Sequence, residues 1–311
     1  MKIYVFSENI SLIAELIGCA RKIDPAAELS AVVAGSAEDA GLVARMGVEQ
    51  VCWLGELGDR LVDDFVPTIA QLIWQKEPEI FLVGATIRGR AVAARVAARL
   101  GTSAVVNAKT ISADCRVSHV VYGGGANRVD TVKTGTLVTT VTAGSAEAAK
   151  AEPASAPIVN VAFIAPSVSA TLLERTPKKA GSSDIMSAKK VVGVGRGFFT
   201  GEDLQYAGDL AEALEGAVGY SRPVTEIVPP IVEGEPYIGV SGITIKPDLY
   251  LAVAVSGQTQ HIAGVLDSKK ILCINSDADA PMFKLSDYGI VGDYKEVIPA
   301  LVAAISAEKN K

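Results

Sequence analysis

The sequence is poor in the residues that build metal centres and disulfide frameworks. Its 311 residues include only two histidines, His119 and His261. It also has four cysteines, which lie far apart and contain no Cys-x-x-Cys pair: Cys19, Cys52, Cys115 and Cys273. The cysteine spacing argues against a structural zinc site and a disulfide framework. The histidine count excludes a multi-histidine metal centre.

Long apolar runs and an excess of positive charge are also missing. No run approaches the roughly 20 residues that span a bilayer, although the mean hydropathy is +0.32. The net charge is −6, and no Lys/Arg stripe suited to nucleic acid occurs. The apolar start Met1–Val5 soon meets Glu8, unlike a signal peptide. We expect a cytoplasmic protein without a transmembrane segment or a nucleic-acid partner.

The first 110 residues alternate short apolar runs with longer helical patterns. Four strands are expected, at Ile3–Phe6, Leu29–Val33, Val51–Leu54 and Ile80–Val83. Four helices are expected between and after them, at Leu12–Arg21, Glu38–Arg45, Asp63–Trp74 and Arg88–Leu100. Gly101 fits the end of the last helix, where glycine adopts the left-handed conformation at little cost. This alternation predicts a parallel sheet covered by helices on both faces.

The pattern then changes, and later resumes. Residues 105–143 carry three strand-like runs without a helix, which predict an antiparallel addition to the sheet: Val117–Tyr122, Val129–Val132 and Leu137–Val141. The segments Gly144–Pro157 and Thr176–Lys190 have the composition of connectors. We place the domain boundary in the second, giving an amino-terminal α/β domain at 1–188 and a carboxy-terminal one at 189–311. The second connector is also a plausible hinge.

Renewed βα alternation predicts a second, smaller parallel sheet in the carboxy-terminal half. Its strands are expected at Val191–Val194, Ala217–Tyr220, Leu249–Val255 and Lys270–Ile274. Its helices are expected at Asp203–Glu215, over the short stretch Thr259–Val265, and from Tyr294 onward. The predicted fold class is therefore α/β with two parallel-sheet domains.

Polar residues follow each strand of this second sheet. In open parallel sheets, ligands bind at the carboxyl ends of the strands. The residues found there are Gly195-Arg196-Gly197, Ser221-Arg222, Ser256-Gly257 with Gln260 and His261, and Asn275. Guanidinium groups, hydroxyls and glycine loops on one edge suit a pyrophosphate. We expect Pro223 to hold Arg222 in an extended conformation, because its ring clashes with a helical preceding residue.

Each of these residues also has a simpler interpretation. Arg196 and Arg222 are equally compatible with surface salt bridges, and Ser256-Gly257 with helix capping. His261 alone would be a packed or capping histidine, and His119, inside a strand run, favours a structural role. A G-x-G-x-x-G fingerprint fails because Phe198 replaces its third glycine, which disfavours an NAD-dependent oxidoreductase. The chain has no G-x-S-x-G elbow of a serine hydrolase.

From Val191 onward the sequence contains a dense set of motifs: Gly195-Arg196-Gly197, Gly219-x-Ser221-Arg222, Lys246-Pro247-x-Leu249-Tyr250, Ser256-Gly257-x-x-Gln260-His261-x-x-Gly264, Ile274-Asn275, Ala280-Pro281-x-Phe283 and Asp287-Tyr288-Gly289-Ile290-Val291-Gly292-Asp293. Through these motifs the sequence resembles the α subunit of bacterial-type electron-transfer flavoproteins. The first half is similar to that family in the order of its strands and helices more than in residue identity.

The resemblance implies FAD bound mainly by the carboxy-terminal domain of a heterodimer with a β subunit. It implies phosphate or cofactor contacts for Arg196, Ser221, Ser256 and Gly257. It places Arg222 near the flavin ring, Gln260 and His261 by the ribityl chain and the N1/O2 edge, and Asn275 and Asp293 on the adenosine side. Cationic and donor groups beside N1 and O2 would stabilise the negative charge of a reduced flavin.

One motif departs from the family pattern. Where many members have Gln-Thr-Gly, this chain has Val240-Ser241-Gly242. Ser241 keeps a hydroxyl that would reach flavin N5, but the neighbouring amide is lost. Flavin potential and partner choice are therefore not carried over from the family.

The implied function is electron carriage without side-chain catalysis. Electrons would pass between a dehydrogenase, often an acyl-CoA dehydrogenase of fatty-acid β-oxidation, and a quinone reductase or a ferredoxin-type redox protein. An adenine-nucleotide-binding sensor or partner module without redox activity is the alternative.

Overall fold

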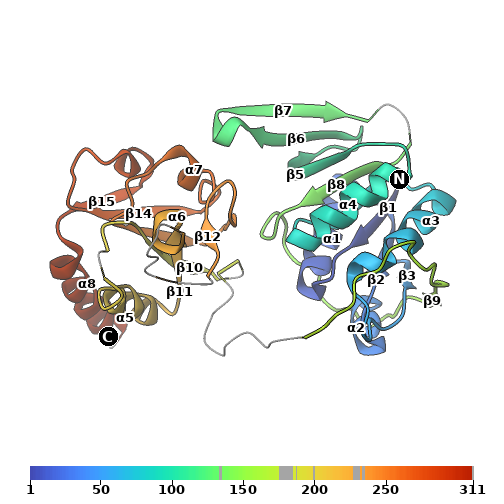
Figure 1. Ribbon diagram of the computed structural model, residues 1–311, viewed down its shortest axis with the longest axis horizontal. Coiled ribbons are helices and arrows are strands. Elements are labelled where there is room, and N and C mark those ends of the chain that lie inside the picture. Colours follow the sequence, from blue (N-terminus) through green and yellow to red (C-terminus); the bar gives the residue numbers. More distant parts are fainter. Residues whose placement is uncertain are drawn as a thin grey trace. The chain divides into compact units, whose positions relative to one another are not determined.

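The chain folds into two α/β units. The computed structural model describes residues 1–132, 135–174, 185–186, 188–198, 200–226, 232 and 235–309. The units are Met1–Pro177 and Lys178–Lys311 (Figure 1). The predicted fold class is confirmed, whereas the boundary after residue 188 stays a prediction. The expected hinge Thr176–Lys190 lies largely outside the described residues.

The amino-terminal unit is built on one sheet whose order is β7-β6-β5-β8-β4-β1-β2-β3-β9. Its strands are β1 (Lys2–Phe6), β2 (Glu28–Val33), β3 (Gln50–Trp53), β4 (Ile80–Gly84), β5 (Ala104–Ile111), β6 (Arg116–Val121), β7 (Ala126–Thr131), β8 (Leu137–Val141) and β9 (Ile158–Asn160). Its helices are α1 (Ile10–Ile23), α2 (Ala37–Val43), α3 (Val66–Lys76) and α4 (Ile87–Arg99). The expected alternation of the first 110 residues is confirmed, and Gly101 adopts φ +69° after α4.

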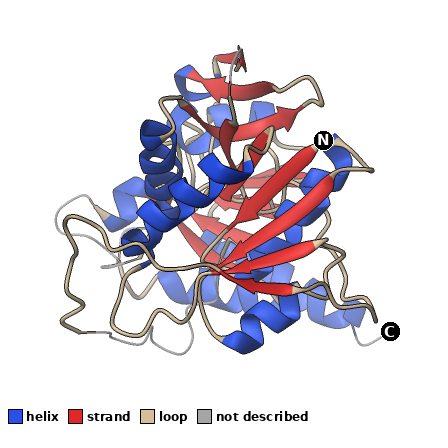
Figure 2. Cartoon of the chain, turned by 90° about the vertical axis from the view of Figure 1, so that its right-hand side faces the viewer, coloured by secondary structure: helices blue, strands red, loops and turns tan. Residues whose placement is uncertain are grey.

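Helices cover both faces of this sheet (Figure 2). Alternate residues of a strand point to opposite faces. Ile3 and Val5 of β1 pack in one core with α1 and α2, and Tyr4 and Phe6 pack in the other with α3 and α4. A strand buried on both sides needs apolar residues at successive positions. This explains the continuous apolar runs read in the sequence.

The predicted antiparallel addition is partly wrong. Strands β6 and β7 do pair antiparallel, with β6 on β5. In contrast, β8 is a parallel strand inserted between β4 and β5. Its polar residues are buried and bonded to β5: Thr139 Oγ1 donates to Val105 O (2.8 Å), and Thr140 Oγ1 accepts from Asn107 N (2.8 Å). These hydrogen bonds let threonines occupy the centre of a covered sheet.

The carboxy-terminal unit has the smaller, parallel sheet that the sequence predicts. Its order is β12-β11-β10-β13-β14-β15, with parallel pairing throughout the described strands. The strands are β10 (Lys190–Val194), β11 (Ala217–Ser221), β12 (Tyr237–Ile238), β13 (Leu249–Val253), β14 (Lys270–Asn275) and β15 (Tyr288–Val291). The helices are α5 (Leu204–Leu214), α6 (Arg222–Thr225), α7 (Thr259–Ile262) and α8 (Tyr294–Lys309).

The two faces of this sheet are covered differently. The long helices α5 and α8 lie side by side over one face (Figure 1). In that core Phe198 stacks on Tyr294, with ring centroids 4.2 Å apart. The other core contains Tyr250 and Met282 and is closed by short elements, α7 and the 3₁₀ turn Pro281–Leu285. Loops therefore form much of that second layer.

The order of the strands reverses at β10. The chain leaves β10 for β11 on one side and later returns as β13 on the other. Loops that leave such neighbouring strands in opposite directions open a crevice at their carboxyl ends, where ligands of open α/β sheets bind. The polar segments 195–197 and 254–261 follow these two strands. The fold thus brings them to the switch point.

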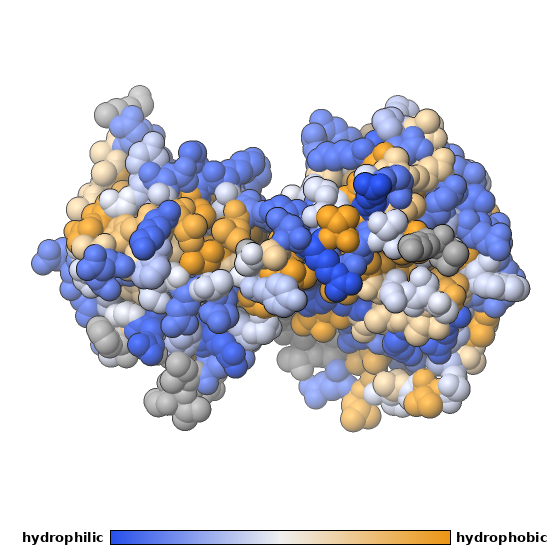
Figure 3. All heavy atoms as spheres, turned by 90° about the horizontal axis from the view of Figure 1, so that it is seen from above, coloured by the Kyte–Doolittle hydropathy of each residue, from blue (hydrophilic) through white to orange (hydrophobic). Residues whose placement is uncertain are grey.

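No helix within the described residues is both long and apolar enough to cross a membrane. Viewed from above, the surface carries hydrophilic and hydrophobic residues interspersed (Figure 3).

A pair of helical glycines tests the packing of the amino-terminal unit. A Cβ at Gly89 of α4 would lie 1.9 Å from the Gly84 carbonyl oxygen of β4, whereas one at Gly41 of α2 would meet nothing within 4 Å. Gly41→Ala should raise stability by about 0.5–1 kcal/mol, because alanine loses less entropy in a helix. Gly89→Ala should instead lower stability by about 1–3 kcal/mol through overpacking.

Denaturation followed by tryptophan fluorescence measures both effects, because Trp53 and Trp74, the two tryptophans of the chain, lie in this unit. Equal gains from the two substitutions would show that α4 does not approach β4 this closely.

Candidate functional site

A cavity of about 810 Å³ lies at the carboxyl edge of the carboxy-terminal sheet. Its size falls within the range of small-molecule and cofactor pockets. Eight of the ten residues singled out in the sequence line it: Arg196, Ser221, Arg222, Ser241, Ser256, Gln260, His261 and Asn275. Two of them end the strands β11 and β14, three lie in the short helices α6 and α7, and the other three lie in the segments that follow β10, β12 and β13. The sheet therefore brings together residues as much as 79 positions apart (275 − 196).

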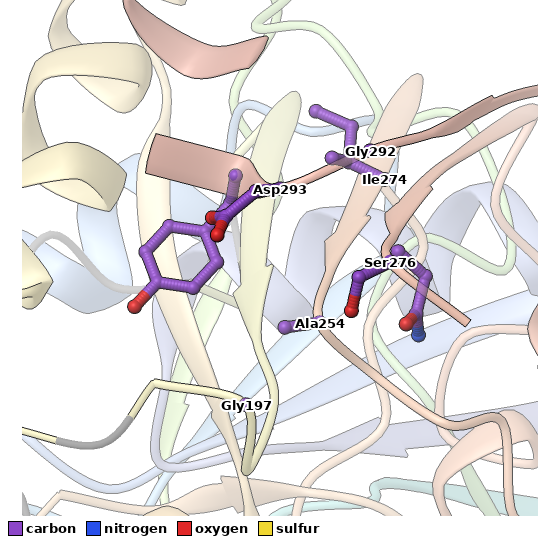
Figure 4. A pocket seen from close by; sticks show the side chains of 8 residues that line it. Gly197, Ala254, Ile274, Ser276, Gly292 and Asp293 are labelled. Atoms are coloured by element: carbon purple, nitrogen blue, oxygen red, sulfur yellow. The ribbon is translucent and has the colours of Figure 1, made fainter. Parts of the chain in front are cut away.

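Gly257 and Asp293 do not line this cavity. Gly257 has φ +86°, and a Cβ there would lie 2.4 Å from the amide nitrogen of Met282. It shapes the loop by letting two backbone segments approach. Asp293 lines a smaller cavity of about 140 Å³, which shares Gly197, Ala254 and Asn275 with the larger one (Figure 4). The Asp293 carboxylate therefore lies at the same edge of the sheet, in a cavity that adjoins the larger one.

The two loops at the switch point touch through backbone atoms. The Gly195 amide donates to Val253 O at 2.9 Å, and a Cβ at Gly195 would lie 1.9 Å from the Ala254 carbonyl oxygen. Ala254 itself has φ +53°, an uncommon conformation for a residue with a side chain. This close approach requires glycine at 195. It leaves backbone and short side chains as the floor of the crevice.

Arg222 is not extended, so that prediction is wrong. It opens helix α6, and the extended residue is Ser221, with φ −81° and ψ 154°. Pro223 fits in the first turn of α6 because backbone N–H groups there have no helical acceptor to lose. The local effect of the proline is thus to begin a helix at the end of β11.

The Arg222 side chain lies at the rim of the cavity beside an acid and an aromatic ring. Its Nε bonds Glu226 Oε2 at 2.7 Å, and its Cζ lies 5.6 Å from the centroid of Tyr237. Tyr237 in turn donates to Ser241 Oγ at 3.0 Å. The side chain of Arg222 is 63% exposed, so solvent screens the ion pair and its contribution to stability is small. Arg222 therefore forms a surface salt bridge and also lines the cavity.

Two buried polar atoms beside the cavity lack hydrogen-bond partners within the described part of the chain: Ser221 Oγ and His261 Nδ1. Ser221 is 6% exposed and His261 8%. The other ring nitrogen of His261, Nε2, lies 2.7 Å from the Tyr250 hydroxyl. Buried polar groups are nearly always satisfied, so unpaired ones need an explanation. Here both residues line the same cavity, which favours a polar ligand.

Burial lowers the pKa of His261 to about 4. A weaker interaction with the backbone of Ile238 raises the pKa of His261, although Nδ1 forms no hydrogen bond with any described residue. His261 is therefore neutral at neutral pH. It can offer a hydrogen bond to a ligand, but not a charge.

Asn275 and Arg196 contribute in different ways. Asn275 joins two loops, since Nδ2 donates to Val255 O at 3.0 Å and Oδ1 accepts from Asp277 N at 3.0 Å. Arg196 is exposed and forms no ion pair with any residue that the structure describes, so the salt-bridge interpretation does not hold for it. Its guanidinium remains available to an anion.

The capping interpretation of Ser256 and Gly257 is also not met. The residue before α7 is Gln258, and no side-chain bond caps that helix. The other histidine, His119, contacts Asp130 Oδ2 at 2.8 Å across the β6–β7 pair, in agreement with a structural role.

Three residues of the site were missed in the sequence. Glu226 and Tyr237 line the cavity, and Tyr250 lies behind His261. Glu226 could have been found from its i,i+4 spacing to Arg222, because residues at this spacing are neighbours on a helix. Tyr250 stands in a quoted motif, but nothing in the letters relates it to a histidine eleven positions later. Among the described residues, no three His, Cys, Asp or Glu side chains cluster as metal ligands would.

The low pKa of His261 predicts a pH-dependent loss of stability. The unfolded chain takes up a proton near pH 6.5, whereas the folded chain does so only near pH 4. Stability is complete above the unfolded pKa and falls as the pH drops toward 4, by about 2 kcal/mol between pH 7 and pH 5. Chemical denaturation at both pH values measures the loss. It should be smaller by this amount in His261→Gln, and an equal loss in both proteins would assign it to other groups.

Comparison with known proteins agrees with this geometry. The family model described as the electron transfer flavoprotein FAD-binding domain matches residues 184–266, and the electron transfer flavoprotein domain matches residues 12–166. The chain is 36% identical over 310 residues to the putative electron transfer flavoprotein subunit YdiR of Escherichia coli K12, covering 98% of each protein. It is 34% identical over 311 residues to the protein FixB of Escherichia coli O157:H7 and to that of Shigella flexneri, again with 98% of each covered.

The resemblance read in the sequence is thus confirmed over the whole chain. The matched FAD-binding domain includes β10–β13 and α7, the elements that carry most of the cavity. FAD is the cofactor of this domain type. This chain belongs to the electron-transfer flavoprotein family, as an FAD-binding subunit of the α type.

Proposed function

We propose that this chain holds FAD in the cavity at the β10–β13 switch point and carries electrons between redox proteins. The observation that supports this most directly is the convergence of eight expected cofactor residues on that one cavity. The cofactor supplies the redox chemistry when it is bound. The residues of the chain bind it, orient it and set the electrostatic field around it.

Arg196 and Ser256 are proposed to hold the pyrophosphate. Both are exposed and line the cavity next to the glycine turns after β10 and β13. Guanidinium groups bind phosphate oxygens through paired hydrogen bonds. Gly195 and Gly257 allow the backbone to approach closely here, so no side chain blocks the phosphates. Asn275, with Asp293 in the adjoining cavity, is proposed to hold the adenosine end.

Arg222, Ser241, Gln260 and His261 are proposed to surround the flavin ring and ribityl chain. Arg222 contributes positive charge, which Glu226 partly offsets. His261 contributes a neutral hydrogen bond from a buried position. Negative charge that develops on the reduced ring is stabilised by such fixed groups. Val240, 55% exposed beside Ser241, takes the place of an amide of many relatives.

Membership of the family supports a proposal for the electron partners. We propose a heterodimer with a β subunit that receives electrons from a dehydrogenase, such as an acyl-CoA dehydrogenase, and passes them to a quinone reductase or ferredoxin-type protein. No side chain of this subunit is proposed to convert a substrate.

Purification together with a β subunit tests the proposal. The complex should be yellow, release FAD on denaturation and accept electrons in an anaerobic reductive titration. A colourless complex that binds ADP in this cavity would contradict it and support a nucleotide sensor.

Two substitutions of opposite sign test the placing of Arg222. Arg222→Ala removes positive charge beside the flavin and should lower its reduction potential, while Glu226→Gln removes the compensating negative charge and should raise it. The pair is exposed and screened by solvent, so we expect shifts of no more than roughly 30 mV for a two-electron couple. Potentiometric titration of the complex measures both. Equal shifts in one direction, or none, would place Arg222 away from the ring.

The unpaired hydroxyl of Ser221 gives a second test. Ser221→Ala should leave the stability of the cofactor-free protein unchanged or raise it by up to about 1 kcal/mol, because a buried orphan group is removed. It should weaken FAD binding by about 5- to 10-fold, the value of one hydrogen bond.

Ser268→Ala is the control for Ser221→Ala, because Ser268 Oγ already bonds Val265 O at 2.6 Å outside the cavity. It should reduce stability and leave FAD affinity unchanged. Retained FAD affinity in Ser221→Ala would exclude a contact between Ser221 and the cofactor.

A further inference from the structure

Tyr250 lies directly behind the site, on the strand that ends at the switch point. Its side chain is fully buried in the loop-covered core, and its hydroxyl lies 2.7 Å from Nε2 of His261. We propose that Tyr250 is a positioning residue that fixes His261 in one tautomer, with the proton on Nδ1, so that Nδ1–H is the donor offered to the bound flavin. The last clause rests on the proposed function, and the tautomer itself does not.

The direction of the Tyr250–His261 hydrogen bond follows from counting donors. A tyrosine hydroxyl has one hydrogen to donate, and no second partner for it exists among the described residues. If His261 donated its Nε2 hydrogen to the hydroxyl oxygen, the hydroxyl hydrogen of Tyr250 would be buried and unpaired, at a cost of the order of a lost hydrogen bond. If Tyr250 donates, its hydrogen is satisfied and Nε2 is the acceptor. A neutral imidazole then carries its proton on Nδ1.

The surroundings keep both partners uncharged. Burial raises the pKa of Tyr250 far above neutral pH and lowers that of His261. The nearby titratable group on the adjacent strand is Cys273, whose pKa burial raises to about 11. On the other side, the backbone of Ile238 raises the pKa of His261, the effect that a carbonyl near a ring N–H produces. Each neighbour is therefore compatible with a proton on Nδ1.

The backbone reserves space for this hydroxyl. A Cβ on Gly193 of β10 would lie 2.0 Å from the Tyr250 oxygen. Gly193 pairs with Ala252 in the sheet, so the strand next to β13 lacks a side chain at the point where the phenol ends. A residue of ordinary size would push the phenol toward His261 and displace the ring. The glycine thus sets the position of Tyr250, which in turn sets the tautomer.

In this site Arg222 therefore offers a ligand positive charge, whereas His261 offers only a neutral dipole. With Nε2 bonded to Tyr250, Nδ1 is the ring nitrogen that has no hydrogen-bond partner among the described residues, and the Ile238 backbone is the group that a ligand would have to compete with for its proton. A fixed Nδ1–H stabilises negative charge on an acceptor without exchanging a proton with it. An Nε2–H tautomer would instead present a lone pair, which repels the same charge.

Histidine ring NMR of the FAD-loaded complex with the β subunit tests this directly. With 15N-labelled histidine, only two rings from this chain give signals, and His119→Gln assigns them. Wild-type His261 should show a protonated Nδ1 and an unprotonated Nε2 from pH 6 to pH 8. Tyr250→Phe should shift the proton toward Nε2 and weaken FAD binding several-fold.

Tyr220→Phe is the matched control, since Tyr220 is a half-buried tyrosine of β11 that does not line the cavity. It should leave the His261 signals unchanged. An Nε2–H tautomer in the wild type would overturn the proposal even if Tyr250→Phe failed to fold. Unchanged His261 signals in a folded Tyr250→Phe complex would overturn it as well.

The same spectra of the FAD-free complex separate the two proposals. An Nδ1–H tautomer in a complex that never binds FAD would contradict the proposed function and leave the role of Tyr250 intact. Bound FAD with an Nε2–H tautomer would contradict the role of Tyr250 alone.

Discussion

The site depends on the close contact between the chain leaving β10 and the chain leaving β13. Gly195 lies against the Ala254 carbonyl with no room for a Cβ, and its amide bonds Val253. Because the two loops then turn to opposite sides of the sheet, a crevice opens above the contact. The strand order and Gly195 create the cavity, and the polar side chains line it. A wider separation of these strand ends would move the loops apart and divide the cavity.

Burial decides which group of the site bears charge. Arg222 lies at the rim, 63% exposed, so its guanidinium keeps much of its hydration and stays charged at little cost. His261 lies on the floor, 8% exposed, where a charge would lose its hydration, and its pKa falls to about 4. Around Arg222 and His261 a ligand therefore meets one screened cation and one buried dipole, and Arg196 adds a second exposed cation to the same cavity.

The sequence predicted what periodicity and strand ends control. The alternating elements of both units and the gathering of seven of the eight site residues follow from parallel strands having their carboxyl ends on one edge. Ser241 follows β12, a strand that the sequence did not predict, and was identified only through the family resemblance. The errors arise where a long-range contact decides. The sequence predicts β8 as part of an antiparallel addition because no helix separates it from the strand-like runs before it. It is instead a parallel strand between β4 and β5, where hydrogen bonds to β5 let its threonines be buried. Arg222 reads as extended before a proline, yet α6 begins there. No local pattern contains the pairing of β8 with β5, whereas a proline in the first turn is itself a local signal for the start of a helix.

Matching a motif also does not say how a residue acts. Gly257 belongs to the same motif as Ser256 and His261, but it acts through a left-handed backbone that lets Met282 approach. Tyr250 belongs to an earlier motif, at the start of β13, and reaches the site only through His261. Gly193, in the core of the sheet, controls the space of that tyrosine. A chain of contacts thus runs from the sheet interior to the cavity, so a substitution that changes only core packing at Gly193 would also change the hydrogen bond that the site offers.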